Sequence, residues 1–104
     1  MASVAEIIET MNSKFKADAA AGLDLIFQFN IDDGETYHLV VKDGACAVAQ
    51  GENDAANVTL IMNTETFEGI ATGETDGMQA FMSGQLRVEG DMMLATKLGE
   101  LFPA

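Results

Sequence analysis

Basic residues, cysteine and histidine are scarce in this sequence of 104 residues. Five basic residues stand against seventeen acidic ones, so the formal net charge is -12. A field of this sign repels phosphate backbones and anionic lipid, which excludes nucleic acid as a partner and predicts no strong binding to anionic membranes. The single cysteine, Cys46, cannot form an internal disulfide, and with one histidine, His38, it falls short of a structural zinc site. We expect neither a metal nor a cofactor.

Long apolar runs are also missing. No segment approaches the eighteen apolar residues of a membrane span, and no N-terminal stretch joins a basic start to an apolar run, so we expect a cytoplasmic protein. With 48% apolar residues, one proline and ten dispersed glycines, the composition is that of a folded chain rather than a disordered acidic tail. A chain of this size can bury about two-thirds of its surface, which predicts one domain over residues 1–104.

Local patterns in the first two-thirds of the chain predict one helix followed by strands. Ser3 and Glu6 have the spacing of a capping box, and apolar residues follow at helical intervals, which predicts a helix over Val4–Lys16. Alternation with a period of two then begins, interrupted by turn signals at Asp33-Gly34 and Asp43-Gly44. The predicted strands are Leu23–Ile31, Tyr37–Val41, Ala45–Gln50 and Val58–Met62. We expect these four to form an antiparallel meander.

Helical spacing returns in the C-terminal third. Two short helices are predicted, the second capped by Asp76 and stopped by Gly84. A fifth strand over Leu86–Val88 separates them from a last helix, which Asp91 caps and which ends at Phe102.

The last predicted helix has a wide apolar face. Its apolar arc covers roughly 180° of the helical wheel, more than one core-facing stripe needs. The arc contains Met92, Leu94, Ala95, Leu98, Gly99, Leu101 and Phe102. Either neighbouring elements sandwich this helix, or part of the face borders a ligand; periodicity alone favours the sandwiched arrangement.

Four methionines in the last third of the sequence either pack in the core or line a binding site. They are Met78, Met82, Met92 and Met93. Flexible thioethers fill gaps in cores more often than they line adaptable binding sites, so the pattern favours core packing over a binding site.

No set of catalytic residues can be assembled from the sequence. His38 has no nucleophile at a recognisable elbow, and the pattern favours a partly exposed strand histidine over a general base. Few cations stand near Cys46, which favours a buried small side chain over a reactive thiol. Asp32, Asp33 and Glu35 lack the spacing of a calcium loop and are predicted to be solvated turn carboxylates. We do not expect an enzyme.

One stretch closely resembles the signature of the sterol carrier protein type-2 family. Residues 79–92 are Gln-Ala-Phe-Met-Ser-Gly-Gln-Leu-Arg-Val-Glu-Gly-Asp-Met, and Leu94, Ala95, Lys97 and Leu98 follow. The similarity extends to the segments 27–31, 43–44, 58–60 and 67–73, and so to nearly the whole chain.

The resemblance implies an α+β fold in which helices cover a five-stranded, mainly antiparallel sheet. It further implies an apolar tunnel between the sheet and the C-terminal helices, which favours a ligand-bordering role for the last helix. Nine residues at matching positions would line that tunnel: Phe81, Met82, Leu86, Val88, Met92, Leu94, Ala95, Leu98 and Phe102. The implied function is noncovalent binding and intracellular transfer of a lipid, such as a fatty acid, a fatty acyl-CoA or a sterol-like ligand. Alternatively, the domain presents a lipid intermediate to a partner enzyme.

Overall fold

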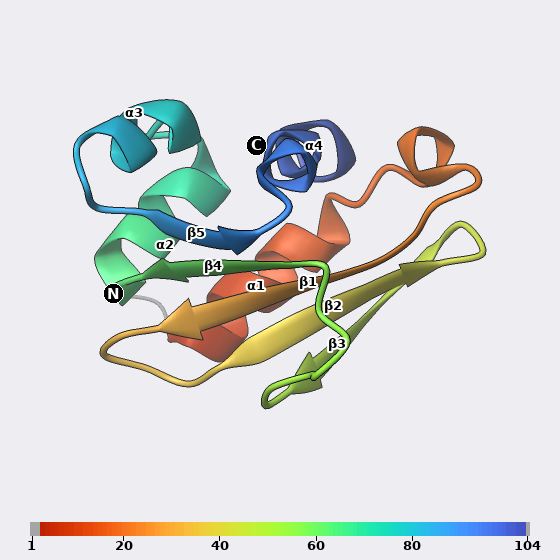
Figure 1. Cartoon of the computed structure of the whole chain (residues 1–104), viewed down its shortest axis with the longest axis horizontal. Helices are drawn as coiled ribbons and strands as arrows, with labels where there is room; N and C mark the ends of the chain where they lie inside the picture. Colours follow the sequence, from red (N-terminus) through yellow and green to blue (C-terminus); the bar gives the residue numbers. More distant parts are fainter. Residues whose placement is uncertain (1–2, 104) are drawn as a thin grey trace.

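The computed structural model describes residues 3–103, and a five-stranded sheet forms its base (Figure 1). The strands are β1 Asp24–Ile31, β2 Tyr37–Lys42, β3 Ala45–Gln50, β4 Val58–Met62 and β5 Arg87–Gly90. Their order across the sheet is β3-β2-β1-β4-β5. The pairs β1/β2, β2/β3 and β4/β5 are antiparallel and β1/β4 is parallel. The predicted α+β class with a mainly antiparallel sheet is therefore confirmed.

The meander predicted for the first four strands is wrong in its last step. β4 does not pair with β3; it lies beyond β2 and β1 and pairs in parallel with β1, placing Leu60 opposite Phe29. An Asp-Gly turn forces neighbouring strands to be antiparallel, but the polar loop 51–57 is long enough to cross the sheet. Asn57 holds the end of this loop on β1, because its Oδ1 accepts from the Ile26 N–H at 2.8 Å and its own N–H donates to the Ile26 carbonyl at 2.9 Å.

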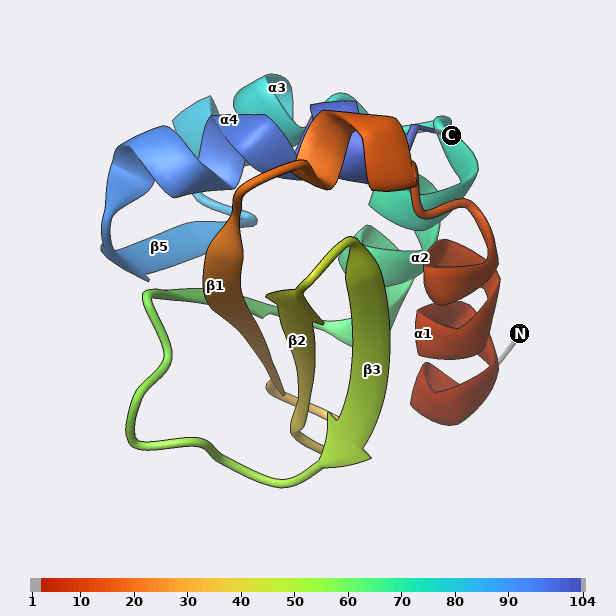
Figure 2. The ribbon, with the colours of Figure 1, turned by 90° about the vertical axis from the view of Figure 1, so that its right-hand side faces the viewer.

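The helices gather on one side of the sheet, and the loop 51–57 runs on the other (Figure 2). They are α1 Val4–Ser13, the 3-10 helix η1 Ala17–Ala20, α2 Thr64–Thr72, α3 Gly77–Met82 and α4 Met92–Leu101. The predicted caps Ser3, Asp76 and Asp91 are all confirmed, although α1 ends at Ser13 rather than at Lys16. Within residues 3–103, none of these helices has the length and apolarity to cross a membrane.

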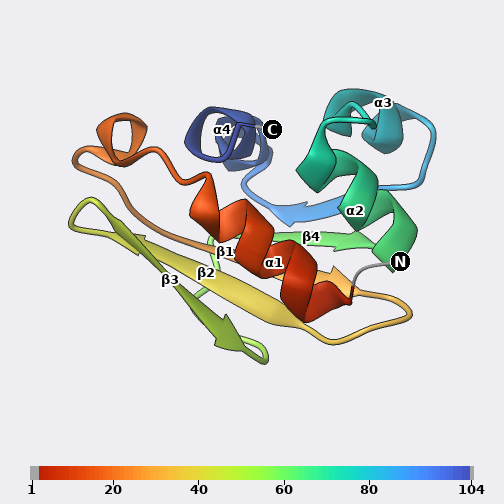
Figure 3. The same cartoon turned by 180° about the vertical axis from the view of Figure 1, so that it is seen from behind.

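α1 and α4 cover different parts of the same sheet face (Figure 3). α1 buries Val4, Ile7, Ile8 and Met11 in the core, which also contains Leu39 and Val41 from β2. α2 packs beside α1, and its Phe67 ring lies 5.3 Å from that of Phe29 on β1.

Asp33 is more than a solvated turn carboxylate. Its Oδ1 accepts two hydrogen bonds of 2.8 Å from Thr64, one from the backbone N–H and one from the side-chain hydroxyl. These bonds favour the charged form and lower the pKa of Asp33. They also tie the start of α2 to the β1–β2 turn.

The lone histidine is buried, which corrects the prediction of a partly exposed side chain. His38 is 9% exposed, and its Nδ1 lies 2.8 Å from the Gly51 carbonyl oxygen. The reason is the crossing loop, which covers the helix-free face where His38 lies. Cys46 is partly buried against the core, and this burial raises the pKa of its thiol to about 11.

Candidate functional site

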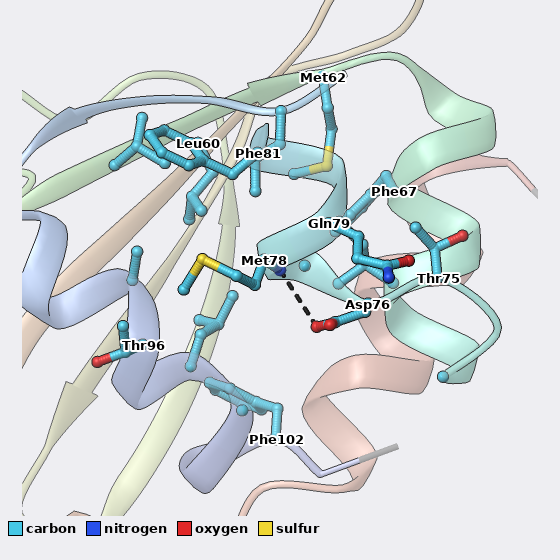
Figure 4. A pocket seen from close by; sticks show the side chains of 18 of the residues that line it. Leu60, Met62, Phe67, Thr75, Asp76, Met78, Gln79, Phe81, Thr96 and Phe102 are labelled. Atoms are coloured by element: carbon cyan, nitrogen blue, oxygen red, sulfur yellow. Dashed lines mark hydrogen bonds between the residues drawn. The ribbon is translucent and has the colours of Figure 1, made fainter. Parts of the chain in front are cut away.

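A cavity of about 740 Å³ lies between the β4–β5 half of the sheet and the helices α2, α3 and α4 (Figure 4). Strands supply Phe29, Leu60, Met62 and Val88, and Leu86 precedes β5. The helices supply apolar walls: Phe67 and Ile70 from α2, Met78 and Phe81 from α3, and Met92, Ala95 and Leu98 from α4. The volume is within the range of small-molecule sites, and the lining is mainly apolar, as such sites require.

The turn between β5 and α4 brings α4 back over the sheet. Gly90 has φ +93°, and an added Cβ would lie 2.6 Å from the Asn57 carbonyl oxygen, so only glycine fits this approach. The next residue, Asp91, donates its N–H to the same carbonyl at 3.1 Å and caps α4 by accepting from the Met93 N–H at 3.0 Å. α4 therefore begins above the β4–β5 edge of the cavity.

α4 contacts protein on one side and the cavity on the other. The Phe102 ring lies 5.5 Å from that of Phe15, and the Leu101 carbonyl accepts from the Lys16 N–H at 2.8 Å. Met92, Ala95, Thr96, Leu98 and Gly99 line the cavity. The wide apolar arc is thus explained by both interpretations together, and Phe102 both packs on Phe15 and lines the cavity.

The turn between α2 and α3 forms the polar end of the cavity. The Thr75 N–H donates to the Gly69 carbonyl at 3.0 Å, and the Thr75 side chain occupies the space that a Cβ at position 69 would need. Asp76 then caps α3, with its Oδ1 accepting from the Met78 N–H at 3.2 Å. These contacts hold Glu74, Thr75 and Asp76 beside the cavity.

Of the nine predicted wall residues, seven line the cavity. They are Phe81, Leu86, Val88, Met92, Ala95, Leu98 and Phe102. Met82 does not; it is 78% exposed and borders a separate groove with Ser83 and Gln85, because consecutive helical residues point about 100° apart. Leu94 is outside the lining as well and packs, half-buried, against the core. Lining residues are candidates for ligand contact, and their role is proposed below.

Several lining residues were not predicted. Three of them lie on strands, where the alternation of apolar residues predicted only a face buried in the core: Phe29, Leu60 and Met62. A period of two does not distinguish a packed core from the floor of a cavity. Met11 belonged to the predicted buried stripe of the first helix. The polar residues Glu74, Thr75, Asp76 and Gln79 gave a capping signal at Asp76 and nothing that indicated a cavity.

The lining can remove an apolar molecule from water, and its polar side chains are Glu74, Thr75, Asp76, Gln79 and Thr96. His38 and Cys46 lie outside it. In the part of the chain that the structure describes, no group of three histidine, cysteine or acidic side chains could hold a metal ion.

Comparison with curated proteins finds relatives along nearly the whole chain. The chain is 31% identical over 102 residues to hydroxysteroid dehydrogenase-like protein 2 from Bos taurus, covering 95% of this chain and 24% of that protein. The chain thus spans between 12% and 24% of the length of the curated relatives it matches.

Two solved structures have the same fold. Palmitated SCP2L2 from Aedes aegypti, solved by NMR in solution, is 27% identical with a TM-score of 0.75, over 99% of this chain and 96% of that one. The sec-alkylsulfatase Pisa1 from Pseudomonas sp. is 22% identical with a TM-score of 0.81, over 90% of this chain and 15% of that enzyme. The sequence model of the SCP-2 sterol transfer family matches residues 4–103. This chain therefore belongs to the SCP-2 sterol transfer family, whose domains bind and transfer lipids.

Proposed function

We propose that residues 1–104 form one domain that binds a single lipid molecule noncovalently in the cavity and carries it within the cytoplasm. The observation that carries this proposal is the apolar cavity of about 740 Å³ between the sheet and α2–α4. Membership of a lipid-transfer family supports it, and so does the palmitate on the related Aedes aegypti domain.

The affinity comes from burying hydrocarbon. Each methylene removed from water contributes about 0.8 kcal/mol, so ten contribute roughly 8 kcal/mol before the cost of ordering the chain is subtracted. The seven lining residues predicted from the sequence supply part of this apolar surface, with Leu60 and Met62 below them. The role is that of a carrier, with binding and release rather than bond breaking.

Native mass spectrometry of the purified protein tests the proposal directly, because a lipid that co-purifies names the ligand class. Calorimetric titration with a series of straight-chain amphiphiles of graded length is the quantitative test. Affinity is expected to rise with chain length and then reach a plateau when the cavity is full. A flat response across the series would remove the cavity as the binding site.

A second candidate function is presentation of a lipid intermediate to a partner enzyme. Large apolar side chains are exposed at the α3–α4 side of the molecule, and three of them, Met78, Phe81 and Met92, also line the cavity. The relatives in which this domain is one part of a longer chain support the same idea. A partner is expected to protect these side chains; unchanged oxidation of Met78 and Met92 by peroxide in a mixture with a candidate enzyme would count against that enzyme.

Membrane contact is expected to be weak and not to be strengthened by anionic lipid. The net charge of -12 is repelled by a negative leaflet over a Debye length of about 8 Å at physiological salt. Cosedimentation with neutral and anionic vesicles checks this, and stronger binding to the anionic vesicles at low salt would contradict it.

A further inference from the structure

The polar side chains of the cavity are gathered at one end. Apart from Thr96 on α4, they come from the α2–α3 turn and the start of α3: Glu74, Thr75, Asp76 and Gln79. Figure 4 shows Thr75, Asp76 and Gln79 together on one side of the cavity and Thr96 on the other. An amphiphile whose hydrocarbon lies among Leu60, Leu86 and Leu98 would therefore place its head group beside Glu74 and Asp76.

None of the five lysines and arginines, all of which lie in the part of the chain that the structure describes, lines this cavity. Lys14 lies outside the lining, and its Nζ donates to the Ala71 carbonyl of α2 at 3.5 Å. Arg87 pairs instead with Asp32, 3.6 Å away. His38 is held under the loop on the opposite face of the sheet.

This arrangement treats anionic and uncharged head groups differently. A carboxylate or phosphate at the polar end would find no basic side chain in the lining and would lie beside two carboxylates in the field of a chain of charge -12. A hydroxyl donates to a carboxylate oxygen, and the side chains of Thr75 and Gln79 can both donate and accept.

We propose that Glu74 and Asp76 make this cavity select amphiphiles with an uncharged, hydrogen-bond-donating head group, such as a hydroxyl, over carboxylate and phosphate head groups. This selectivity rests on the proposed lipid-binding function. It narrows the expected ligands from fatty acids, acyl-CoA and sterol-like molecules to the hydroxyl-bearing ones.

The test compares two probes of equal chain length, 1-dodecanol and dodecanoate, by titration calorimetry at low salt. At about pH 8 dodecanoate is fully ionised, and wild-type protein is expected to bind the alcohol at least about tenfold more tightly. Raising the salt concentration should narrow this gap, because salt screens the repulsion of the exposed carboxylates.

The variant Glu74→Gln/Asp76→Asn removes both charges while changing the shape little. Asparagine caps a helix as well as aspartate does, so the hydrogen bond to the Met78 N–H is retained and α3 is expected to stay intact. In this variant the preference should fall to about threefold or less. The matched control is Glu52→Gln/Asp54→Asn in the loop on the helix-free face, which changes the net charge equally and should leave the preference as in wild type.

The outcomes distinguish failure of the lipid-binding function from failure of the head-group selectivity. If neither probe binds, the lipid-binding function fails. If both bind with equal affinity to wild type, the function stands and the selectivity is overturned. If the control variant loses the preference as much as the cavity variant does, net charge rather than Glu74 and Asp76 sets it, which overturns the assignment to these residues.

Discussion

α1 and α4 cover neighbouring parts of one sheet face, and the packing under α1 is closed except at Met11, which lines the cavity. The side chains of Ile7 and Ile8 on α1 are 3% and 0% exposed. On α4 the side chain of Met92 is 49% exposed while it also lines the cavity. Both helices have an apolar face, so amphipathicity alone does not decide whether a helix closes a core or borders a space.

Side-chain volume explains the difference. α1 packs against β3 and α2 and buries the branched side chains of Val4, Ile7 and Ile8. α4 presents Ala95 and Gly99, which are four residues apart and therefore lie on the same face, and both line the cavity. Small side chains hold α4 over the sheet without filling the volume beneath it.

The largest effect on stability is expected from shortening a side chain of α1 that is buried in the core. Ile8→Ala should lower the free energy of unfolding by about 2 to 5 kcal/mol, because it removes fully buried methyl groups and leaves a void. Urea unfolding measures the loss, and titration with 1-dodecanol should give an affinity close to wild type. A clear fall in affinity with little loss of stability would show that the α1 half is not closed.

The reactivity of Cys46 on β3 reports on how often α1 and β3 separate. Burial raises the pKa of its thiol to about 11, so at about pH 8 the thiolate fraction is on the order of 100-fold below that of a free cysteine. We expect its reaction with a disulfide reagent to be slowed by on the order of tenfold or more, because the greater intrinsic nucleophilicity of a thiolate of raised pKa offsets part of this loss. Ligand should leave the rate unchanged. A rate equal to that of the urea-unfolded chain would mean that α1 and β3 separate readily.

Leu98 sharpens the comparison, because it is buried and yet lines the cavity. Leu98→Ala should destabilise the lipid-stripped protein by less than about 2 kcal/mol, since the side chain already lacks packing partners on one flank. Its main effect should be on ligand affinity or preferred chain length, and Met92→Ala should behave alike. The control is Met93→Ala, which changes a residue that is 76% exposed and outside the lining. A large loss of stability with unchanged affinity would assign Leu98 to ordinary core.

The smallest effect is a gain. A Cβ at Gly99 meets no atom within 4 Å, and glycine inside a helix costs about 0.5 to 1 kcal/mol relative to alanine. Gly99→Ala should therefore raise the free energy of unfolding by about that amount in urea unfolding, with a small decrease in cavity volume. Loss of stability would show that position 99 is more tightly packed than the cavity requires.

Most elements of the fold could be predicted from local signals. The capping box at Ser3 and Glu6 and the caps Asp76 and Asp91 are short-range patterns, and each marks a helix start in the structure. The parallel pairing of β4 with β1 could not be predicted, because the hydrogen bonds between Asn57 and Ile26 join residues about thirty positions apart.

The cavity was predictable only in part. The resemblance indicated C-terminal residues such as Phe81 and Leu98, and these line it. It did not separate Met82 from Phe81, since the direction of each side chain depends on how the six-residue helix α3 is docked. The strand residue Leu60 and the polar residue Glu74 come together only through the parallel crossover and the α2–α3 turn, for which the sequence has no local signal.

The methionines allow the central claim, that a lipid chain occupies this cavity, to be tested in one experiment. With methyl groups labelled by carbon-13, methionine NMR spectra can be followed during titration with 1-dodecanol. Met11, Met62, Met78 and Met92 line the cavity, so their methyl signals should shift and saturate together. Met82 and Met93 lie outside it and should not move. Shifts confined to Met82 and Met93, or none at saturating alcohol, would contradict the account.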